Sequence, residues 1–314
     1  MDLLTTPLHD MFGPVTLSYV FLAMGLNIHY GYTGLLNFGQ AAFAAVGAYT
    51  LAVSVASFDI PFVLAILLGV LAAVLLGLLM GIPTLRLRAD YLAIVTIAVA
   101  ESCRLIFSTQ WKSHFHARDG VRGFVGGFRD LNPLPDYEGR VLSYNRNDLW
   151  VMIVGWALVA LVCLLVWLLM RSPWGRVLKG IREDENAVRS LGKNVYSYKM
   201  QALVFGGVIG AFGGFIGALG NASVVPDDYN TDVTFVALTM LILGGAARVM
   251  SPVVGAMLFW GLFSFMGVLL DDVMSSNQIT MIRWILVGVA LMLLMIFRPQ
   301  GIFGDKKELA LDAR

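Results

Sequence analysis

Ile60-Pro-Phe-Val-Leu-Ala-Ile-Leu-Leu-Gly-Val-Leu-Ala-Ala-Val-Leu-Leu-Gly-Leu-Leu-Met-Gly-Ile82 contains no charged side chain. A helix that crosses a bilayer needs about 20 mostly apolar residues, so this stretch is long enough to span a membrane. The whole chain agrees, because 58% of its 314 residues are hydrophobic and only 14% are charged. Soluble domains have roughly 45–50% apolar and about 25% charged residues. The sequence therefore predicts an integral membrane protein.

Similar apolar stretches recur along the chain and predict an all-α, polytopic membrane helical bundle of about 8–10 transmembrane helices. We expect one transmembrane domain over 1–314, without a separate soluble domain. No basic segment precedes the first stretch, so no cleavable signal peptide is indicated. The nine expected spans are approximately 15–30, 36–56, 60–82, 91–108, 149–170, 200–220, 233–250, 253–270 and 281–297.

The positions of Lys and Arg in the short loops predict the orientation. The segment 171–199 holds seven of them, whereas the loop 221–232 has three aspartates and neither Lys nor Arg. This asymmetry predicts an outside N-terminus, an inside C-terminus and a cytoplasmic 171–199 segment. The long loop 109–147 is then expected to be external, although it holds six Lys and Arg residues.

The polar segment 172–192 predicts a capped helical hairpin. Ser172 before Pro173 is typical of a helix start, Asp184 of a second N-cap, and Gly192 of the residue that ends the second helix. Two short amphipathic helices that are too polar to enter lipid indicate a docking element, and a solvated loop with incidental helicity is the alternative. The apolar positions are Val177, Leu178 and Ile181 on the first helix, and Val188 and Leu191 on the second.

Two spans are unusually polar or small for lipid-facing helices. The second opens with Asn37-Phe-Gly-Gln40, and polar side chains at membrane depth normally face protein or a water-filled cavity. A break in the helix there would expose backbone groups, which is tolerated only where they are buried or line a path. The sixth span has glycines that let helix backbones approach closely. These helix-packing glycines are Gly206, Gly210, Gly213, Gly214 and Gly217.

Charged residues inside the spans are few. Glu101 and Arg104 lie three residues apart in the fourth span, and the favoured interpretation is an ion pair with each other. A role in a transport path is the alternative. The segment Tyr91–Thr96 before Arg104 has a faint counterpart in 235–240 before Arg248, at a constant offset, which indicates a possible inverted repeat.

The sequence lacks the motifs of the common catalytic sites. There is no G-x-x-x-x-G-K-[ST] segment, no G-x-S-x-G segment and no metal-spaced His/Cys/Asp cluster. His114-x-His116 is expected to be a solvated pair, and no metal site is predicted. The net charge of +1 gives no indication of nucleic-acid binding. We therefore expect a protein that is not an enzyme, holds no cofactor of its own and uses an external energy source.

Four blocks in this order resemble the LivM-type membrane subunit of ATP-binding-cassette importers for branched-chain amino acids (the LivH/LivM permease family). The resemblance covers nearly the full length of the chain. The blocks are Gly31-Tyr-Thr-Gly-Leu-Leu-Asn-Phe-Gly-Gln40 with the residues up to Thr50, 172–199, Leu243-Gly-Gly245 with 251–256, and Phe297-Arg-Pro-Gln-Gly-Ile-Phe-Gly304.

This resemblance implies a multi-pass permease of the inner (cytoplasmic) membrane. Its partners would be a second, LivH-type permease, two cytoplasmic P-loop ATPases that bind ATP and Mg, and an extracytoplasmic substrate-binding protein. The hairpin would contact the ATPases through Gly175, Arg176, Val177, Leu178, Gly180, Ile181, Arg182, Asp184, Val188, Leu191 and Gly192. The residues expected along the substrate path are Asn37, Phe38, Gly39, Gln40, Thr96 and Glu101.

The implied function is uptake of branched-chain, hydrophobic amino acids driven by the partner ATPases. Urea and short amides are alternative substrates, because importers for them use the same permease type. An ion-coupled secondary transporter or channel is the alternative from another class. In that case 172–192 would be only a linker, and uptake would collapse with the proton gradient.

Overall fold

The computed structural model describes residues 2–87, 89–109, 119–134 and 145–270, together with scattered positions between 278 and 302. The described chain is an all-α bundle with one two-residue strand pair, so the predicted fold class is confirmed. The elements are α1 (Asp2–Phe12), α2 (Pro14–Leu26), the π-helix η1 (Asn27–Tyr32), α3 (Gln40–Phe58), α4 (Phe62–Thr84), α5 (Ala89–Thr109), β1 (Val121–Arg122), α7 (Gly126–Arg129), α8 (Arg146–Arg171), α9 (Pro173–Glu183), α10 (Glu185–Ser190), α11 (Val195–Asn221), β2 (Ser223–Val224), the 3-10 helix η3 (Pro226–Tyr229), α12 (Thr231–Gly244) and α13 (Ser251–Leu270).

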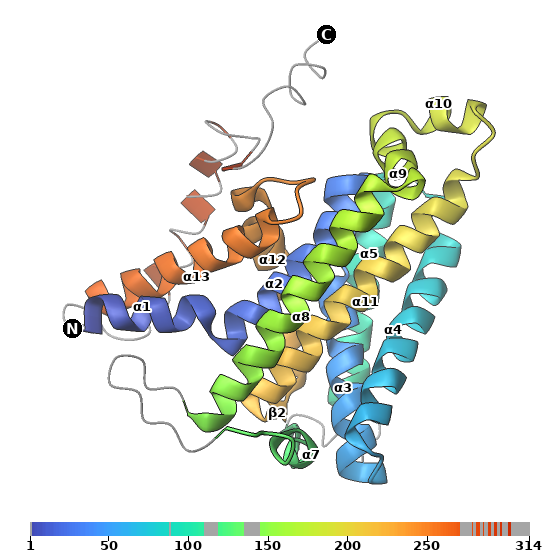
Figure 1. Ribbon diagram of the computed structural model, residues 1–314. Helices are drawn as coiled ribbons and strands as arrows, with labels where there is room; N and C mark the ends of the chain where they lie inside the picture. Colours follow the sequence, from blue (N-terminus) through green and yellow to red (C-terminus); the bar gives the residue numbers. More distant parts are fainter. Residues whose placement is uncertain are drawn as a thin grey trace.

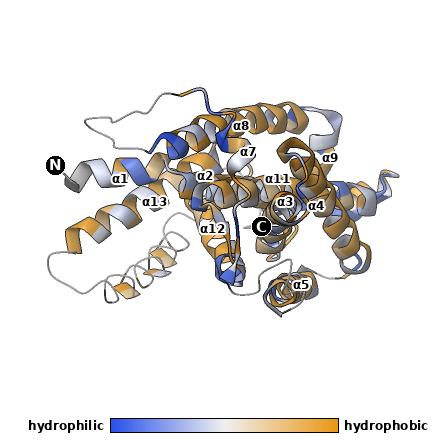
Figure 2. Ribbon diagram, turned by 90° about the horizontal axis from the view of Figure 1, so that it is seen from below, coloured by the Kyte–Doolittle hydropathy of each residue, from blue (hydrophilic) through white to orange (hydrophobic). Residues whose placement is uncertain are grey.

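The core of the bundle is formed by α11 and by α2 and α3, which both pack extensively along α11. Figure 1 shows α8 and α4 beside α11, and α1 with α13 crossing to one side at a steep angle. Viewed along the helices, hydrophobic residues cover most of the bundle, and α5 lies at its margin (Figure 2). The outer helices α4 and α8 turn leucine-rich faces outward, as expected for contact with lipid.

Six described helices are long and apolar enough to span a membrane, and up to seven if the bent α1–α2 pair counts as one span. This number is smaller than the nine spans predicted from the sequence, for two reasons. The stretch 233–250 was expected to form one span, but α12 has 14 residues and ends at Gly244, which is too short to span alone. Most of the stretch 281–297 lies outside the described residues.

The first span is neither straight nor continuous with the second. Thr5–Phe12 and Pro14–Tyr32 meet at an angle of 46°. Gly13 is extended between them, and Pro14, which has no N–H to donate, starts the next helix. After η1 the chain is non-helical until Gln40, so the second span begins four residues later than the predicted 36. Residues 34–39 are thus a break inside the apolar part of the fold.

The two ends of the bundle carry different segments. The hairpin α9–α10 lies at one end, and the β1–β2 pair lies at the other (Figure 1). Val121 pairs with Val224, so the basic 109–147 loop and the acidic 221–232 loop meet at that second end. This arrangement agrees with the predicted threading, in which both loops face away from the hairpin. Which end faces the cytoplasm stays a prediction from the Lys and Arg distribution.

Candidate functional site

A chain of buried polar side chains crosses the break between η1 and α3. The Nε2 atom of His29 lies 3.0 Å from the carbonyl oxygen of Leu203 on α11, and the Nδ1 atom lies 3.0 Å from Asn37 Nδ2. Gln40 Nε2 donates to the carbonyl oxygen of Gly206 at 3.1 Å. His29, Asn37 and Gln40 are all buried. The network therefore ties the break to the middle of α11.

The hydrogen bonds of Asn37 fix the orientation of its amide and the tautomer of His29. Asn37 Oδ1 accepts from Gly39 N at 2.9 Å, so its Nδ2 must be the atom that faces His29. The Nδ1 atom of His29 then accepts, and its Nε2 carries the proton that it donates to Leu203. Each nitrogen of the uncharged His29 ring thus has a hydrogen-bond partner within the chain.

Side chains from two further helices complete the break. Phe38 N donates to Thr96 Oγ1 of α5 at 3.0 Å, and Ala41 N donates to Thr234 Oγ1 of α12 at 3.0 Å. The first N–H groups of a helix have no partner within it, and in a membrane each unpaired group is costly. Thr234 supplies such a partner to Ala41 in the first turn of α3, and Thr96 supplies one to Phe38 in the non-helical break. The helices α5 and α12 are therefore joined to the start of α3.

The residues expected along a substrate path are mostly enclosed. Asn37, Gly39, Gln40 and Thr96 are buried and bonded or packed within the chain. Phe38 is half-buried, and its ring centroid lies 5.3 Å from that of Phe235. In this structure the enclosed side chains hold the break in shape and have little surface for a substrate. Their role in a path stays a prediction.

Asn27, two residues before His29, forms similar hydrogen bonds to the connection between α12 and α13. Its Nδ2 atom donates to the carbonyl oxygen of Arg248 at 2.8 Å, and its Oδ1 atom accepts from Ala247 N at 2.9 Å. Gly301 lies against Gly245 at the start of the same connection, and Ile302 N donates to Leu243 O at 3.0 Å. The last two sequence blocks therefore contact each other. Asn27 and Thr234 were not among the predicted site residues, because their partners lie about two hundred residues away in sequence.

The hairpin forms as expected, with one difference at its first residue. Pro173 is the first residue of α9, but Ser172 Oγ donates to the carbonyl oxygen of Leu169 and caps no N–H group. Asp184 caps α10 by accepting from Asn186 N at 2.8 Å and Ala187 N at 3.1 Å. Gly192 has φ of +76°, the left-handed conformation that ends a helix.

The apolar face of the hairpin does not point outward. Leu178 is fully buried, Ile181 is 4% exposed and Val188 is 8% exposed, all within this chain. These three side chains pack within this chain, because helix periodicity identifies an apolar face but not its partner, and their contact with an ATPase stays a prediction. Val177 is half-buried, and Leu191 is 79% exposed. The surface that a partner could reach also includes Arg176, Arg182, Asp184, Arg189 and Gly192.

One arginine connects the hairpin directly to the break. Arg182 Nη1 donates to the carbonyl oxygen of Gly31, in η1, at 2.6 Å. Gly34, with φ of +72°, lies against the Arg182 side chain, and a Cβ atom there would be 3.4 Å from its Cγ. At the other end of α9, Gly175 touches the backbone of Met170, while Gly180 faces Val188. A displacement of α9 would therefore be transmitted to the residues that precede Asn37.

The glycines of α11 lie where other side chains and backbones touch it. A Cβ atom at Gly206 would collide with His29, at Gly210 with Gln40, and at Gly214 with the carbonyl group of Ala44. At Gly213 it would lie 2.7 Å from Ser18 O, and at Gly217 it would lie 3.1 Å from Ser18 Oγ. These positions admit the buried amides and the imidazole to the surface of α11.

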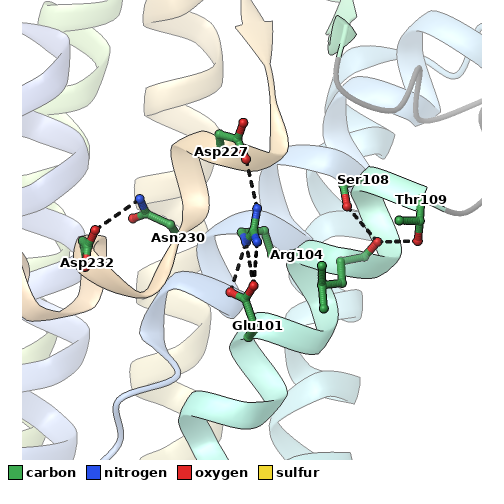
Figure 3. Close-up of polar contacts among 8 residues, drawn as sticks. Glu101, Arg104, Ser108, Thr109, Asp227, Asn230 and Asp232 are labelled. Carbon is green, nitrogen blue, oxygen red and sulfur yellow. Dashed lines mark hydrogen bonds and ion pairs between the residues drawn. The ribbon is translucent and has the colours of Figure 1, made fainter.

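Glu101 and Arg104 form the expected pair, and a third residue joins it (Figure 3). Arg104 Nε lies 3.0 Å from Glu101 Oε2, and Arg104 Nη1 lies 2.9 Å from Asp227 Oδ1 in η3. Because Arg104 is near the end of α5 and Asp227 lies just before α12, these helices run in opposite directions. The inverted repeat itself stays a prediction. This cluster is partly exposed, with 40% of the Glu101 side chain accessible.

A cavity of about 320 Å³ opens beside this cluster. Its wall includes Tyr19, Asp227, Asp228, Asp232 and Trp260. Burial, and secondarily the charge of Asp227, raises the pKa of Asp228 above its usual value. In the described part of the chain, no group of three or more His, Cys, Asp or Glu residues could hold a metal ion. His114-x-His116 lies outside the described residues.

Spanning helices, a break at membrane depth with satisfied backbone groups, and a polar hairpin on one end define a multi-pass membrane transport protein. The chain belongs to the family described as "Branched-chain amino acid transport system / permease component", whose model matches residues 14–298. It is thus a transport subunit of the ABC permease class, and not an enzyme, in the cell membrane.

Individual relatives agree with the family. The chain is 29% identical to the high-affinity branched-chain amino acid transport system permease protein LivM of Salmonella typhimurium and of Escherichia coli, over 92% of this chain and 68% of each relative. It is 24% identical to a probable LivM of Methanocaldococcus jannaschii, over 92% of this chain and 91% of that one. The solved structure of PsaBC from Streptococcus pneumoniae in complex with Fab aligns with a TM-score of 0.48 and 14% identity, over 98% of this chain and 95% of that chain.

Proposed function

We propose that the chain is one of two permease subunits of an importer that moves branched-chain amino acids into the cell. A binding protein outside delivers the substrate, and two P-loop ATPases inside hydrolyse ATP. Family membership and the names of the LivM relatives support the substrate class. The alternative of an ion-coupled transporter has little support, because the Glu101–Arg104–Asp227 cluster is partly exposed at one end of α5 and each member is paired.

The observation that carries the coupling proposal is the contact between Arg182 and Gly31. The hairpin is held at its base by buried Leu178 and Ile181, and its helix α9 contacts η1, which precedes the break. An ATPase that binds the exposed side of the hairpin would move α9 as a rigid unit. The Gly31 carbonyl group, η1 and the His29–Asn37–Gln40 network would follow, and α3 would shift against α11.

In this mechanism the permease needs only weak substrate contacts, and selectivity rests with the binding protein. Closure of the ATPases changes the position of α9, and ATP hydrolysis restores it. The break can switch because its hydrogen bonds join α3 to three other helices, α5, α11 and α12, through single side chains. Two packings of such a junction can differ by only a few kcal/mol.

Leu191→Asp tests the ATPase contact without disturbing the interior. Leu191 is 79% exposed, so the variant should fold normally, keep its thermal unfolding temperature and lose most of the co-purifying ATPase. Leu131→Asp is the matched control, because Leu131 is 61% exposed at the opposite end of the bundle. Normal ATPase recovery with Leu191→Asp, or equal loss in both variants, would contradict the proposed contact.

Uptake in reconstituted vesicles tests the substrate and the energy source. Purified complex with the binding protein should import labelled leucine, isoleucine or valine only with ATP, and a proton ionophore should leave uptake unchanged. Uptake of urea or acetamide without uptake of leucine would replace the proposed substrate. Uptake that needs a proton gradient and no ATP would replace the mechanism.

A further inference from the structure

A second cavity, of about 510 Å³, lies at the end of the bundle that carries the hairpin. It is formed where the last turn of α8, the helix α9, the end of η1 and the α12–α13 connection meet. Its lining includes Tyr32, Trp167, Arg171, Lys179, Arg248 and Met250. Neither the acidic cavity at the opposite end nor the buried network at the break shares any of these side chains.

The cavity gathers positive charge from three separate elements. Arg171 ends α8, Lys179 lies on α9, and Arg248 lies on the α12–α13 connection. Among the described residues that line it there is neither Asp nor Glu. Arg171 and Lys179 form no ion pair with a described residue and instead lie near aromatic rings, 3.9 Å from the ring centroid of Trp167 and 5.9 Å from that of Tyr32. A cavity of this kind attracts an anion.

The backbone that carries Arg248 is fixed before any ligand arrives. Asn27 holds both the Arg248 carbonyl group and the Ala247 N–H group. Ala247 has φ of +63°, an uncommon value for a residue with a side chain, and these two hydrogen bonds stabilise it. The cation is therefore presented from a defined loop, which lowers the entropic cost of binding.

The surroundings favour a lipid over a soluble anion. Trp167 is 41% exposed and lies one turn before Arg171, and tryptophan is enriched at membrane–water interfaces. Leu164 and Leu168 of α8 are more than half exposed and extend from this level into the apolar zone. Met250, on the opposite wall, is 60% exposed. A ligand with one anionic end and one apolar end fits such a site.

We propose that this cavity binds the phosphate-bearing head group of an anionic phospholipid from the cytoplasmic leaflet, with an acyl chain along α8. Arg171, Lys179 and Arg248 surround the phosphate, and Leu164 and Leu168 contact the chain. Basic pockets between helices on the cytoplasmic side are suited to such head groups. The bound lipid links α8, α9 and the α12–α13 connection, so it stabilises the base of the hairpin.

The test measures lipid retention by the purified full chain. Wild type, the triple variant Arg171→Gln/Lys179→Gln/Arg248→Gln and the control Arg86→Gln/Arg189→Gln/Lys193→Gln are each titrated with phosphatidylglycerol or phosphatidylcholine and examined by native mass spectrometry. The control loses the same charge from exposed positions on the same end. We expect one tightly held phosphatidylglycerol in wild type and control, and binding at least about tenfold weaker in the triple variant.

A second measurement places the lipid and remains informative if the triple variant folds poorly. Phosphatidylglycerol with brominated chains, at low mole fraction, should quench Trp167 more strongly than brominated phosphatidylcholine does, and the difference should vanish in Trp167→Phe. Equal weakening in the triple variant and its control, or equal quenching by the two lipids, would overturn the proposal. So would inorganic phosphate at millimolar concentration occupying the site while no phosphatidylglycerol is retained.

Discussion

Two helices of this bundle, α11 and α4, have opposite relations between apolarity and burial. The most apolar 18 residues of α4 have a mean hydropathy of 3.0, and 22% of them are buried. The corresponding residues of α11 have a mean hydropathy of 2.0, and 72% of them are buried. In water the more apolar helix would be the interior one. In a bilayer, leucine can contact lipid without loss, and the interior of the bundle is formed by helices whose small residues permit close contact. High hydropathy in this chain therefore marks the outside of the bundle.

The largest effect is expected when a glycine of α11 is enlarged, because this tests whether α11 needs close contact with its neighbours. Gly214→Ala places a methyl group into the carbonyl group of Ala44, a backbone atom that cannot rotate away, so α3 and α11 must separate. We expect a loss of about 3 kcal/mol or more, at the upper end of the range for overpacking. Thermal unfolding of the purified chain in detergent measures it.

Gly217→Ala is the matched control on the same helix. Its nearest neighbour would be Ser18 Oγ at 3.1 Å, a side-chain atom that can adjust. The control should lose much less stability than Gly214→Ala. Similar unfolding temperatures for the two variants would show that α11 does not depend on backbone contact with α3.

Replacing one leucine by alanine on each helix compares the stability that a leucine contributes inside the bundle and on its outer surface. Leu203 of α11 is 1% exposed and Leu75 of α4 is 56% exposed. Leu203→Ala leaves a cavity between packed helices and should cost about 2 kcal/mol or more. Leu75→Ala exchanges leucine for lipid contact and should change the unfolding free energy by less than about 0.5 kcal/mol. Equal losses at the two positions would mean that α4 is covered by protein in the purified chain.

Much of this organisation could be predicted from the sequence, since apolar length determines where a chain can cross a bilayer. The prediction failed where apolar residues continue past a helix end. The predicted span 233–250 carries one charged residue, Arg248, near its end, yet Gly245 adopts φ of +103° and already ends α12 before it. The residues that follow form a connection held by Asn27. A hydropathy window cannot detect this stop, because it depends on a contact made 220 residues away.

The candidate site shows the same limit. The polarity of Asn37 and Gln40 indicated an unusual segment, and the structure shows a break there. Gln40 Nε2, Phe38 N and Ala41 N bond to Gly206, Thr96 and Thr234, which lie on helices whose pairing is determined only by the complete bundle. In the hairpin, Ile181 and Leu191 are both apolar, and only packing determines which one is exposed. Local patterns identify candidate residues, and tertiary contacts decide what those residues touch.

The smallest expected effect is at the end of the bundle, where a cavity lined by several aspartates opens beside η3. Burial and the neighbouring Asp227 raise the pKa of Asp228 above its ordinary value of 3.8. The folded state therefore binds this proton more readily than the unfolded state does. Lowering the pH through the raised value stabilises the folded chain, and the gain ends near the ordinary value.

Asp228→Asn isolates this contribution. At neutral pH the variant should unfold at a temperature higher by less than about 2 °C, because an uncharged amide avoids the cost of a half-buried carboxylate. The difference between variant and wild type should shrink as the pH falls through the raised pKa. A variant that is less stable at neutral pH, or a difference that grows in acid, would show that the Asp228 carboxylate is favourably bound in the fold. The end of the bundle would then resemble the amide network at its centre, where each polar group is matched to a partner.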